Sequence, residues 1–410
     1  MDKDSKNLVV GLDIGTSKIV AIVAEVGPDG ELNVIGLGTQ PSRGLKRGVV
    51  VNIEATMASI QRVLEEAELM ADCRIGAVTT GIAGSHIRSL NSSGMVAIKE
   101  GEVAQADIDR VIETAKAIAI PNDQQILHIL PQEFIIDGQD GVREPLGMSG
   151  VRLEVKVHIV TGAVSAVENI AKCVRRCGIE ITDIVLQPLA SAAAVLNDDE
   201  KDLGVCLMDI GGGTTDIAVF AGGAIRHTAV IPIAGDQVTN DIAMTLRTPT
   251  KEAEELKIRH GCALRQLADA NDVVEVPGVG ERAPRKLSRP MLAEVVEPRV
   301  EELYTLVQSE LRRSGFEELL SSGVVITGGT SMLQGMAELG EEVFHLPCRI
   351  GVPAYMGGLA DVVRSPRYST AIGLLMHGRD QRMRAEAARA QVRGIGGVAE
   401  RMRLWFKANF

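Results

Sequence analysis

Two short segments, far apart in the chain, contain residue types that bind phosphate and magnesium. Each has an apolar run, then Asp-Ile-Gly, then small or hydroxyl residues, then a second apolar run; they are LVVGLDIGTSKIVAIV (8–23) and LGVCLMDIGGGTTDIAVF (203–220). Glycine leaves backbone N–H groups open to a phosphate and hydroxyl groups add donors, while a carboxylate at a strand end can hold Mg²⁺ through water. The pattern predicts two hairpins whose turns grip one triphosphate from both sides of a cleft.

The two predicted turns supply most of the candidate nucleotide-binding residues. Those of the first turn are Asp13, Gly15, Thr16, Ser17 and Lys18. Those of the second turn are Asp209, Gly211, Gly212, Gly213, Thr214 and Thr215. Asp13 and Asp209 are also the candidate Mg²⁺ ligands, each acting through water. Because these two aspartates lie almost half a chain apart in similar surroundings, the repeat predicts two similar domains that face each other.

Three more segments complete the candidate site. In VVITGGTSMLQG, Gly328 and Gly329 follow an apolar strand, so a flat base can lie against the backbone without a Cβ clash, and Met332 is a further candidate there. In LQPLASAAAVL, Gln187 lies where a strand ends and a helix of small residues begins, and a second small-residue helix at 368–375 is placed to cross the first. One glycine turn alone is more often a plain turn, but five ordered segments favour a nucleotide site. The chain lacks the GxxxxGK[ST] of P-loop proteins.

These segments need strands and helices to position them, and the chain alternates between the two. Helical periodicity includes 56–71 and 292–315, the latter with Pro298 as a point where the helix bends or breaks. Strand-like runs occur between the helices, and this alternation predicts α/β domains with mixed sheets. Two stretches differ and are expected to be insertions: a small α+β unit within 85–160 and a charged, mainly helical unit within 237–312.

The composition is that of a globular protein with more than one domain. The 410 residues are 45% hydrophobic and 24% charged, enough for two or more cores. The net charge of −11 argues against a general nucleic-acid binder, which needs an excess of Lys and Arg. The six cysteines form no CxxC pair and are expected to be reduced thiols. With neither a signal-peptide pattern nor an apolar run of about 18 residues, we expect a cytoplasmic protein.

The last part of the chain has the pattern of a helix that lies in a membrane interface. From 379 to 397 the composition is that of a flexible linker, helical at most in part. Arg403 and Lys407 lie opposite an apolar arc, and the residues from 379 onward include eight Lys and Arg against three Asp and Glu. The arc comprises Ile395, Val398, Met402, Trp405, Phe406 and Phe410. Such a helix inserts its apolar face at the acyl boundary and binds anionic headgroups; the alternative is a helix docked on its own domain.

The five segments resemble the phosphate 1, connect 1, phosphate 2, adenosine and connect 2 motifs of the superfamily of actin, heat-shock chaperones and sugar kinases, over residues 8–378. More narrowly, the chain resembles the FtsA family of bacterial cell-division proteins throughout its length. The segments that carry this resemblance, besides the tail, are VGLDIGTSKI, QPLASAAAVL, MDIGGGTTDIAVF, AEELKIRHGCA, AEVVEPRVEEL and YSTAIGLL. The resemblance implies an α/β, actin-like ATPase fold, with two lobes around a nucleotide cleft.

The resemblance also implies a layout of subdomains, with an inserted 1C subdomain that is peculiar to this family. The implied segments, in chain order, are 1A (1–84), 1C (85–162), 1A again (163–204), 2A (205–236), 2B (237–312), 2A again (313–357), a return to 1A (358–378), a linker (379–394) and the amphipathic helix (395–410).

Three residues receive roles from the resemblance. Glu254 and Lys257 match positions near the ribose and base, and Gln187 matches the position that orients the attacking water in actin. Glutamine can orient water but is a poor general base. We therefore expect ATP hydrolysis to be slow at most, and ATP with Mg²⁺ to act mainly as a conformational and assembly switch.

The implied function is that of a polymerising membrane tether. Members of the family are expected to bind the C-terminal tail of the tubulin-like protein FtsZ through 2B, to assemble with themselves, and to recruit later division proteins at the cytoplasmic face of the inner membrane. The implied FtsZ contacts are Arg289, Glu297, Arg299 and Tyr304. Alternatives within the superfamily are a small-molecule kinase, a chaperone ATPase and a pilus-assembly scaffold like PilM.

Overall fold

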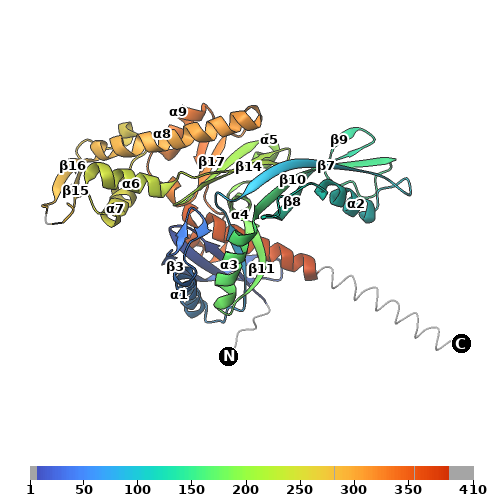
Figure 1. The fold of residues 1–410 in the computed structure, drawn as a ribbon, viewed down its shortest axis with the longest axis horizontal. Helices are drawn as coiled ribbons and strands as arrows, with labels where there is room; N and C mark the ends of the chain where they lie inside the picture. The colour runs from blue at the N-terminus through green and yellow to red at the C-terminus, as the bar shows by residue number, and fades with distance from the viewer. Residues whose placement is uncertain (1–6, 281, 355, 387–410) are drawn as a thin grey trace.

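The computed structural model describes residues 7–280, 282–354 and 356–386, which form two lobes and an inserted domain (Figure 1). Lobe 1 is built on a six-stranded sheet with the spatial order β11 (Glu180–Leu186), β6 (Ala77–Ile82), β1 (Leu8–Ile14), β2 (Lys18–Val26), β3 (Leu32–Pro41) and β19 (Gly357–Gly358). Lobe 2 is built on a five-stranded sheet with the order β14 (Ala224–Ile231), β13 (Thr215–Ala221), β12 (Val205–Ile210), β17 (Val324–Thr327) and β18 (Cys348–Ile350). Both sheets mix parallel and antiparallel pairs, as the alternation of strands and helices predicts.

The two lobes repeat one arrangement of strands. In lobe 1, β1 pairs antiparallel with β2 and parallel with β6, and in lobe 2, β12 pairs antiparallel with β13 and parallel with β17. Nearly every residue of these hairpin strands is buried, because helices or the other lobe cover both faces of each sheet. The internal repeat in the sequence therefore corresponds to two similar lobes, as expected.

Helices cover the sheet of lobe 1, and two of them cross closely beneath the cleft. The helices are α1 (Ile53–Ala71), α3 (Val164–Arg176), α4 (Gln187–Val195) and a last helix over 369–386, and a short hairpin joins β4 (Leu45–Lys46) to β5 (Val49–Val50). A Cβ added at Gly373 would lie 1.8 Å from the Ala190 carbonyl oxygen. Only glycine permits this approach of α4 and the last helix, which confirms the expected crossing of the two small-residue helices.

Lobe 2 carries a helical region at its far end (Figure 1). It contains α6 (Gly235–Leu246), α7 (Thr250–His260), the hairpin of β15 (Val273–Val276) and β16 (Arg285–Ser288), and α8 (Arg289–Ser314); α9 (Met336–Phe344) follows β17, and α5 (Asp198–Leu203) leads into β12. α8 passes through Pro298 without ending there. Val296 and Val300 on either side of it are buried in the core of lobe 2, and this packing offsets the lost backbone hydrogen bond.

The inserted domain has its own sheet and its own core, as the α+β pattern of 85–160 predicts. Its four strands have the order β7 (Arg88–Ala97), β10 (Arg152–Ala163), β8 (Gln124–Ile136) and β9 (Gln139–Val142), all antiparallel, and α2 (Gln105–Lys116) packs on β7 and β10. The core of this domain includes Val111 of α2, Phe134, Val155 and Ile159. The domain extends to the side of the two lobes, next to β14 (Figure 1).

The last helix extends into the segment that was expected to be a linker, helical at most in part. It continues from 369 to 386, so the first eight residues of the segment expected to be a linker, 379–394, are helical. Hydrogen bonds to the body hold this part: the Gln381 amide donates to Asp183, and the Arg382 guanidinium donates to Asn7. The rest of the linker and the amphipathic helix at 395–410 lie outside the described residues. Within the described part of the chain, no helix combines the length and the apolar character needed to span a bilayer.

Candidate nucleotide site

A cavity of about 420 Å³ lies between the two lobes at the turns of the two hairpins. All but one of the residues predicted to bind nucleotide line it, together with Gln187 at the start of α4. These residues are Asp13, Gly15, Thr16, Ser17, Lys18, Asp209, Gly211, Gly212, Gly213, Thr214, Glu254, Lys257, Gly328, Gly329 and Met332. Five segments spread over most of the chain therefore form one site.

The two turns have the same local geometry and touch one another. The Gly15 N–H donates to the Lys18 carbonyl oxygen at 3.1 Å, and the Gly211 N–H donates to that of Thr214 at 3.0 Å. A Cβ added at Gly212 would lie 1.7 Å from the Ser17 hydroxyl. Glycine is therefore required where the two turns meet. Turns of this kind can present backbone N–H groups to an anion.

Asp13 and Asp209, the predicted magnesium ligands, are both buried and both line the cavity. Asp13 accepts a hydrogen bond from the Gln187 amide at 2.9 Å, and Asp209 accepts bonds from Ser191 at 2.5 Å and Thr370 at 3.1 Å. Burial raises the pKa of Asp13 to about 7, against the opposing charge of Lys18. Burial also raises the pKa of Asp209, although its two hydroxyl donors oppose the shift.

This pair of carboxylates fits a magnesium ion that is brought by a nucleotide. Mg²⁺ usually keeps several waters and binds one or two carboxylates together with the phosphates of its nucleotide. Two buried carboxylates with raised pKa values also gain from a nearby cation, which favours their charged forms. Among the described residues, no group of three or more acidic, His or Cys side chains is suited to hold a metal ion.

Asp216 is a third buried carboxylate of the cavity, and it was not among the predicted residues. It is the register partner of Asp209 in the β12–β13 hairpin. Its Oδ2 accepts a bond from the Thr214 hydroxyl at 3.0 Å, whereas its Oδ1 has no partner. Burial, with Asp209 nearby, raises the pKa of Asp216 to about 7. The signal for it was the last letter of DIGGGTTD, because residues paired across a hairpin lie on the same face of the sheet.

Lys18 is the cation that faces these carboxylates. Its ammonium donates to the Arg367 carbonyl oxygen and lies 4.9 Å from the centre of the Tyr368 ring. Burial lowers the pKa of Lys18 to about 8, although the negative charge of Asp13 partly opposes this shift. Arg367 and Thr370 both line the cavity. The segment 368–375 was expected to be part of the site as a helix that crosses another, but neither residue was predicted to line the cavity. The return segment into lobe 1 therefore supplies part of the site.

The wall formed by lobe 2 contains the residues expected near the ribose and base. Lys257 donates to Glu254 at 2.7 Å and to the Thr239 hydroxyl at 2.9 Å, so both side chains of α7 are held in place. Gly328 has φ of +89°, and a Cβ there would lie 2.5 Å from the Asp209 carboxylate. The side chain of Met332 is 58% exposed at the rim. The apolar side chain of Met332 and the bare backbone at Gly328 together form a surface against which a flat base can pack.

Two predicted residues have side chains that are buried away from the cavity and from the surface. Thr215 is fully buried and does not line the cavity, because alternation along β13 turns its side chain away; its hydroxyl donates to the Ile233 carbonyl oxygen at 2.8 Å. Tyr304 is fully buried on the inner face of α8, where its hydroxyl donates to the Met336 carbonyl oxygen at 2.9 Å. Tyr304 therefore has no surface to offer to a partner.

The other three residues expected to contact a partner lie on or near the outer side of α8. Arg299 forms an ion pair with Asp241 of α6 at 2.5 Å and a second with Glu302, and all three residues line a second cavity of about 320 Å³. Arg289 donates to the His260 carbonyl oxygen, and Glu297 accepts from the Arg265 N–H. The groove beside Arg299 is thus lined by both charge signs.

Comparison with families of known proteins agrees with this architecture. One family model, described as Cell division protein FtsA, matches residues 206–373. A second, described as SHS2 domain inserted in FTSA, matches residues 84–161, which include most of the inserted domain.

Relatives align with the chain from end to end. It is 62% identical over 414 residues to the Cell division protein FtsA of Pseudomonas aeruginosa, covering 99% of each chain. It is 54% identical to that of Neisseria meningitidis, covering 97% of this chain and 98% of the relative. It is 45% identical to that of Escherichia coli K12, covering 99% of each.

Solved structures share the fold at low sequence identity. The PilM-PilN type IV pilus biogenesis complex matches with a TM-score of 0.66 and 17% identity, over 90% of this chain and 98% of that one. MreB5 of Spiroplasma citri bound to ADP matches with a TM-score of 0.56 and 16% identity, over 93% and 98%. These likenesses concern the fold alone, and they confirm the expected actin-like architecture.

Proposed function

Because this chain belongs to the FtsA family of cell division proteins, we propose that it is an ATP-binding protein that assembles with itself, tethers FtsZ to the cytoplasmic face of the cell membrane and recruits later division proteins. The observation that supports nucleotide binding is the cavity lined by two facing glycine turns and three buried carboxylates. A polymer would then carry many membrane-binding tails and gain avidity that one tail lacks.

In this proposal each lobe holds part of Mg·ATP. The N–H groups of the Gly15–Lys18 and Gly211–Thr214 turns bind the phosphates, and Lys18 adds a charge. Asp13 and Asp209 hold the waters of Mg²⁺, which when bound neutralises phosphate charge. Glu254, Lys257 and Met332 border the ribose and base.

We expect slow ATP hydrolysis because the residue at the position expected to orient the attacking water is a glutamine, Gln187. Gln187 lines the cavity and donates to Asp13 at 2.9 Å, so its amide is already engaged and it has no carboxylate with which to accept a proton. An amide is a poor general base. In this proposal the main signal for assembly is nucleotide binding, which holds the two lobes together. Hydrolysis of the nucleotide then returns the protein to its starting state.

The membrane part of the proposal rests on the sequence of 395–410. It is tested by pelleting the full chain with vesicles that contain anionic lipid. Deletion of 395–410 and Trp405→Glu should each leave the protein in the supernatant, because the latter places a charge on the apolar arc. Ala408→Glu adds the same charge outside that arc and should pellet nearly as well as the parent chain. Pelleting of the truncated chain would contradict the tether.

The FtsZ part is tested with a fluorescent peptide of the FtsZ C-terminal tail. We propose that it binds beside Arg299 on α8, where ion pairs line a groove of both charge signs. Arg299→Ala should weaken binding at least about tenfold, as expected for loss of a charge-assisted contact. Arg312→Ala, in the last turn of the same helix, should leave the peptide affinity unchanged. Equal losses in both variants would contradict this placement.

A further inference from the structure

The outer edge of β14 is covered by side chains of the inserted domain. β14 stands at one end of the strand order of lobe 2, so its outward backbone carbonyl groups need partners from elsewhere. Ser89 donates to the Thr228 carbonyl oxygen at 2.9 Å, Asn91 to that of Arg226 at 3.4 Å, and Gln132 to that of Ile225 at 2.9 Å. The inserted domain thus sits on lobe 2 through side chains that replace a neighbouring strand.

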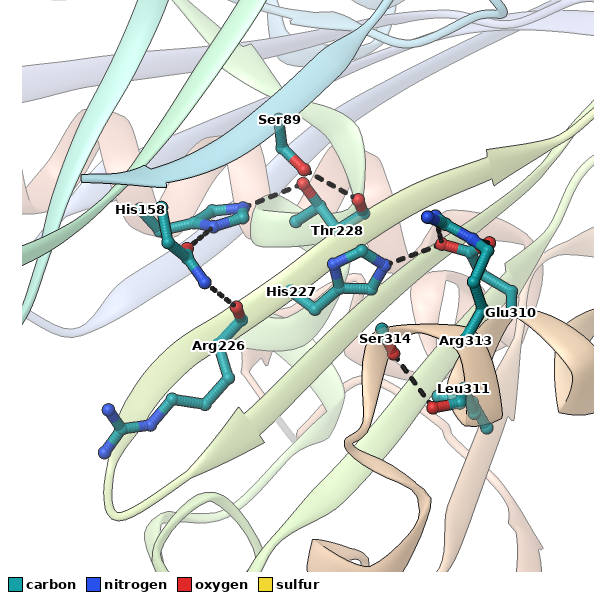
Figure 2. Close-up of polar contacts among 10 residues, drawn as sticks. Ser89, His158, Arg226, His227, Thr228, Glu310, Leu311, Arg313 and Ser314 are labelled. Carbon is teal, nitrogen blue, oxygen red and sulfur yellow. Dashed lines mark hydrogen bonds and ion pairs between the residues drawn. The ribbon is translucent and has the colours of Figure 1, made fainter.

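His158 also takes part in this contact, and its partners determine the direction of the hydrogen bonds. His158 is 1% exposed, and its Nδ1 lies 2.7 Å from the side-chain oxygen Oδ1 of Asn91, while its Nε2 lies 3.0 Å from the Thr228 hydroxyl (Figure 2). Because the amide nitrogen of Asn91 donates to β14, its oxygen must accept, so Nδ1 carries the proton and the Thr228 hydroxyl donates to Nε2. One network therefore joins three strands of the inserted domain, β7, β8 and β10, to β14.

The residue before Thr228 in β14, His227, points the other way and contacts α8. His227 Nε2 lies 2.8 Å from Glu310 near the end of α8, and its ring stacks on Phe316 with centroids 5.9 Å apart. Arg313 donates to the same Glu310 carboxylate at 2.6 Å and 2.9 Å. Figure 2 shows His227 and Thr228 as neighbours on β14, with His158 on one side and Glu310 on the other. Successive side chains of a strand point to opposite faces, so β14 contacts the inserted domain through Thr228 and α8 through His227.

We propose that β14 couples the inserted domain to α8, so that the seating of the domain and the position of the end of α8 form one cooperative unit. Two features support this. The joint consists largely of side-chain hydrogen bonds, whose geometry tolerates little displacement. In addition, α8 is one continuous helix of 26 residues, about 39 Å long, and Glu310 lies in the part after Pro298, so a shift within that part moves Glu310. Arg299 lies in the middle of the same helix, eleven residues before Glu310.

Hydrogen exchange of the full chain, followed by mass spectrometry, tests this coupling. Glu310→Ala removes the contact with His227 and keeps a helix-favouring residue. We expect exchange in the inserted-domain peptides that cover 88–91 and 128–132 to rise about fivefold, although Glu310 touches neither. Glu317→Ala breaks the Arg312–Glu317 ion pair at the same end of α8 and is the matched control. Faster exchange confined to α8 and β14, or an equal rise in the control, would overturn the proposal.

The reciprocal experiment starts from the inserted-domain side, since coupling between two sites must act in both directions. Thr228→Val keeps the shape of the side chain and removes the hydroxyl that binds His158. Exchange in the last turns of α8, around 308–316, should then rise severalfold. Ser92→Ala, which removes a hydrogen bond to Ala115 inside the inserted domain, should leave it unchanged. An effect of Thr228→Val that stops at β14 would show two independent contacts and overturn the coupling.

Discussion

The two hairpins at the cleft have the same backbone arrangement and the same first aspartate, but they differ in their second charged residue. Superposing their turns places Lys18 opposite Thr214, Ile19 opposite Thr215, and Val20 opposite Asp216. Lobe 1 therefore contributes a cation behind its turn, whereas lobe 2 contributes three glycines and a second carboxylate. The repeated fold therefore gives two similar turns for binding phosphate. A few positions that differ between the hairpins give the two lobes different charges at the site.

The largest effect is expected where the two hairpins are alike. Asp209→Ala removes one of the two equivalent carboxylates and leaves the buried Ser191 and Thr370 hydroxyls without their acceptor. We expect the affinity for ATP in Mg²⁺ to fall about 100-fold, or ~2.7 kcal/mol, measured by isothermal titration calorimetry. Asp199→Ala, at an exposed position of the same lobe, is the control. An unaltered affinity would remove Asp209 from the site.

A smaller effect should distinguish the cation from its counterpart in lobe 2. Lys18→Met keeps the length of the side chain but removes its charge, whereas Thr214→Val removes only a hydroxyl. Charge-assisted hydrogen bonds contribute about 1.5–3 kcal/mol and neutral ones about 0.5–1.5 kcal/mol. The ATP affinity should therefore fall more for Lys18→Met than for Thr214→Val, by roughly tenfold between them. Equal losses in the two variants would show that the lobes do not divide the charge as we describe.

The second carboxylate of lobe 2 should lower stability in the absence of nucleotide and magnesium. The folded protein keeps a proton on Asp216 up to about pH 7, whereas the unfolded chain releases it near 3.8. The folded state thus binds more protons between these values, so stability decreases as pH rises through them. Asp216→Asn removes this loss and should raise the free energy of unfolding by about 1–2 kcal/mol at pH 8.

Urea denaturation at pH 8 and pH 5 measures this difference. The gain from Asp216→Asn should shrink at pH 5, where the parent side chain is itself protonated and neutral. Asp199→Asn should change neither value. A gain of equal size at both pH values would mean that the charge of Asp216 is not its cause.

The smallest effect on nucleotide binding is expected at Thr215, which is equivalent to the buried Ile19. Thr215→Val should leave the ATP affinity within about twofold of the parent. It should cost about 1 kcal/mol of stability, because it removes the hydrogen bond to Ile233. A large loss of affinity would restore Thr215 to the site.

Much of the fold and most of the site were accessible from the sequence, because glycines and aspartates at strand ends are local signals. Thr215 and Asp216 were misjudged for one reason: strand alternation begins directly after the turn, so two adjacent residues face opposite ways. Aligning the two hairpins with each other would have placed Thr215 with Ile19 in the core. Arg367 gave no such signal, since its place at the cavity depends on how the last helix returns to lobe 1.

Long-range packing also decided the two other differences. Tyr304 lies in a charged helical stretch where an exposed position was expected, but the buried face of α8 needs it against Met336 and Phe344. The helix over 369–386 extends into a segment with linker-like composition, because Asp183 and Asn7 bind its side chains. Neither partner is near in the sequence.

A crystal structure with Mg²⁺ and a non-hydrolysable ATP analogue tests the central claim most directly. We predict phosphate oxygens about 3 Å from N–H groups of both turns, Gly15–Lys18 and Gly211–Thr214, and the metal ion between Asp13 and Asp209 with water in its coordination shell. An analogue that binds outside the cavity, or that contacts the turn of one lobe only, would contradict it.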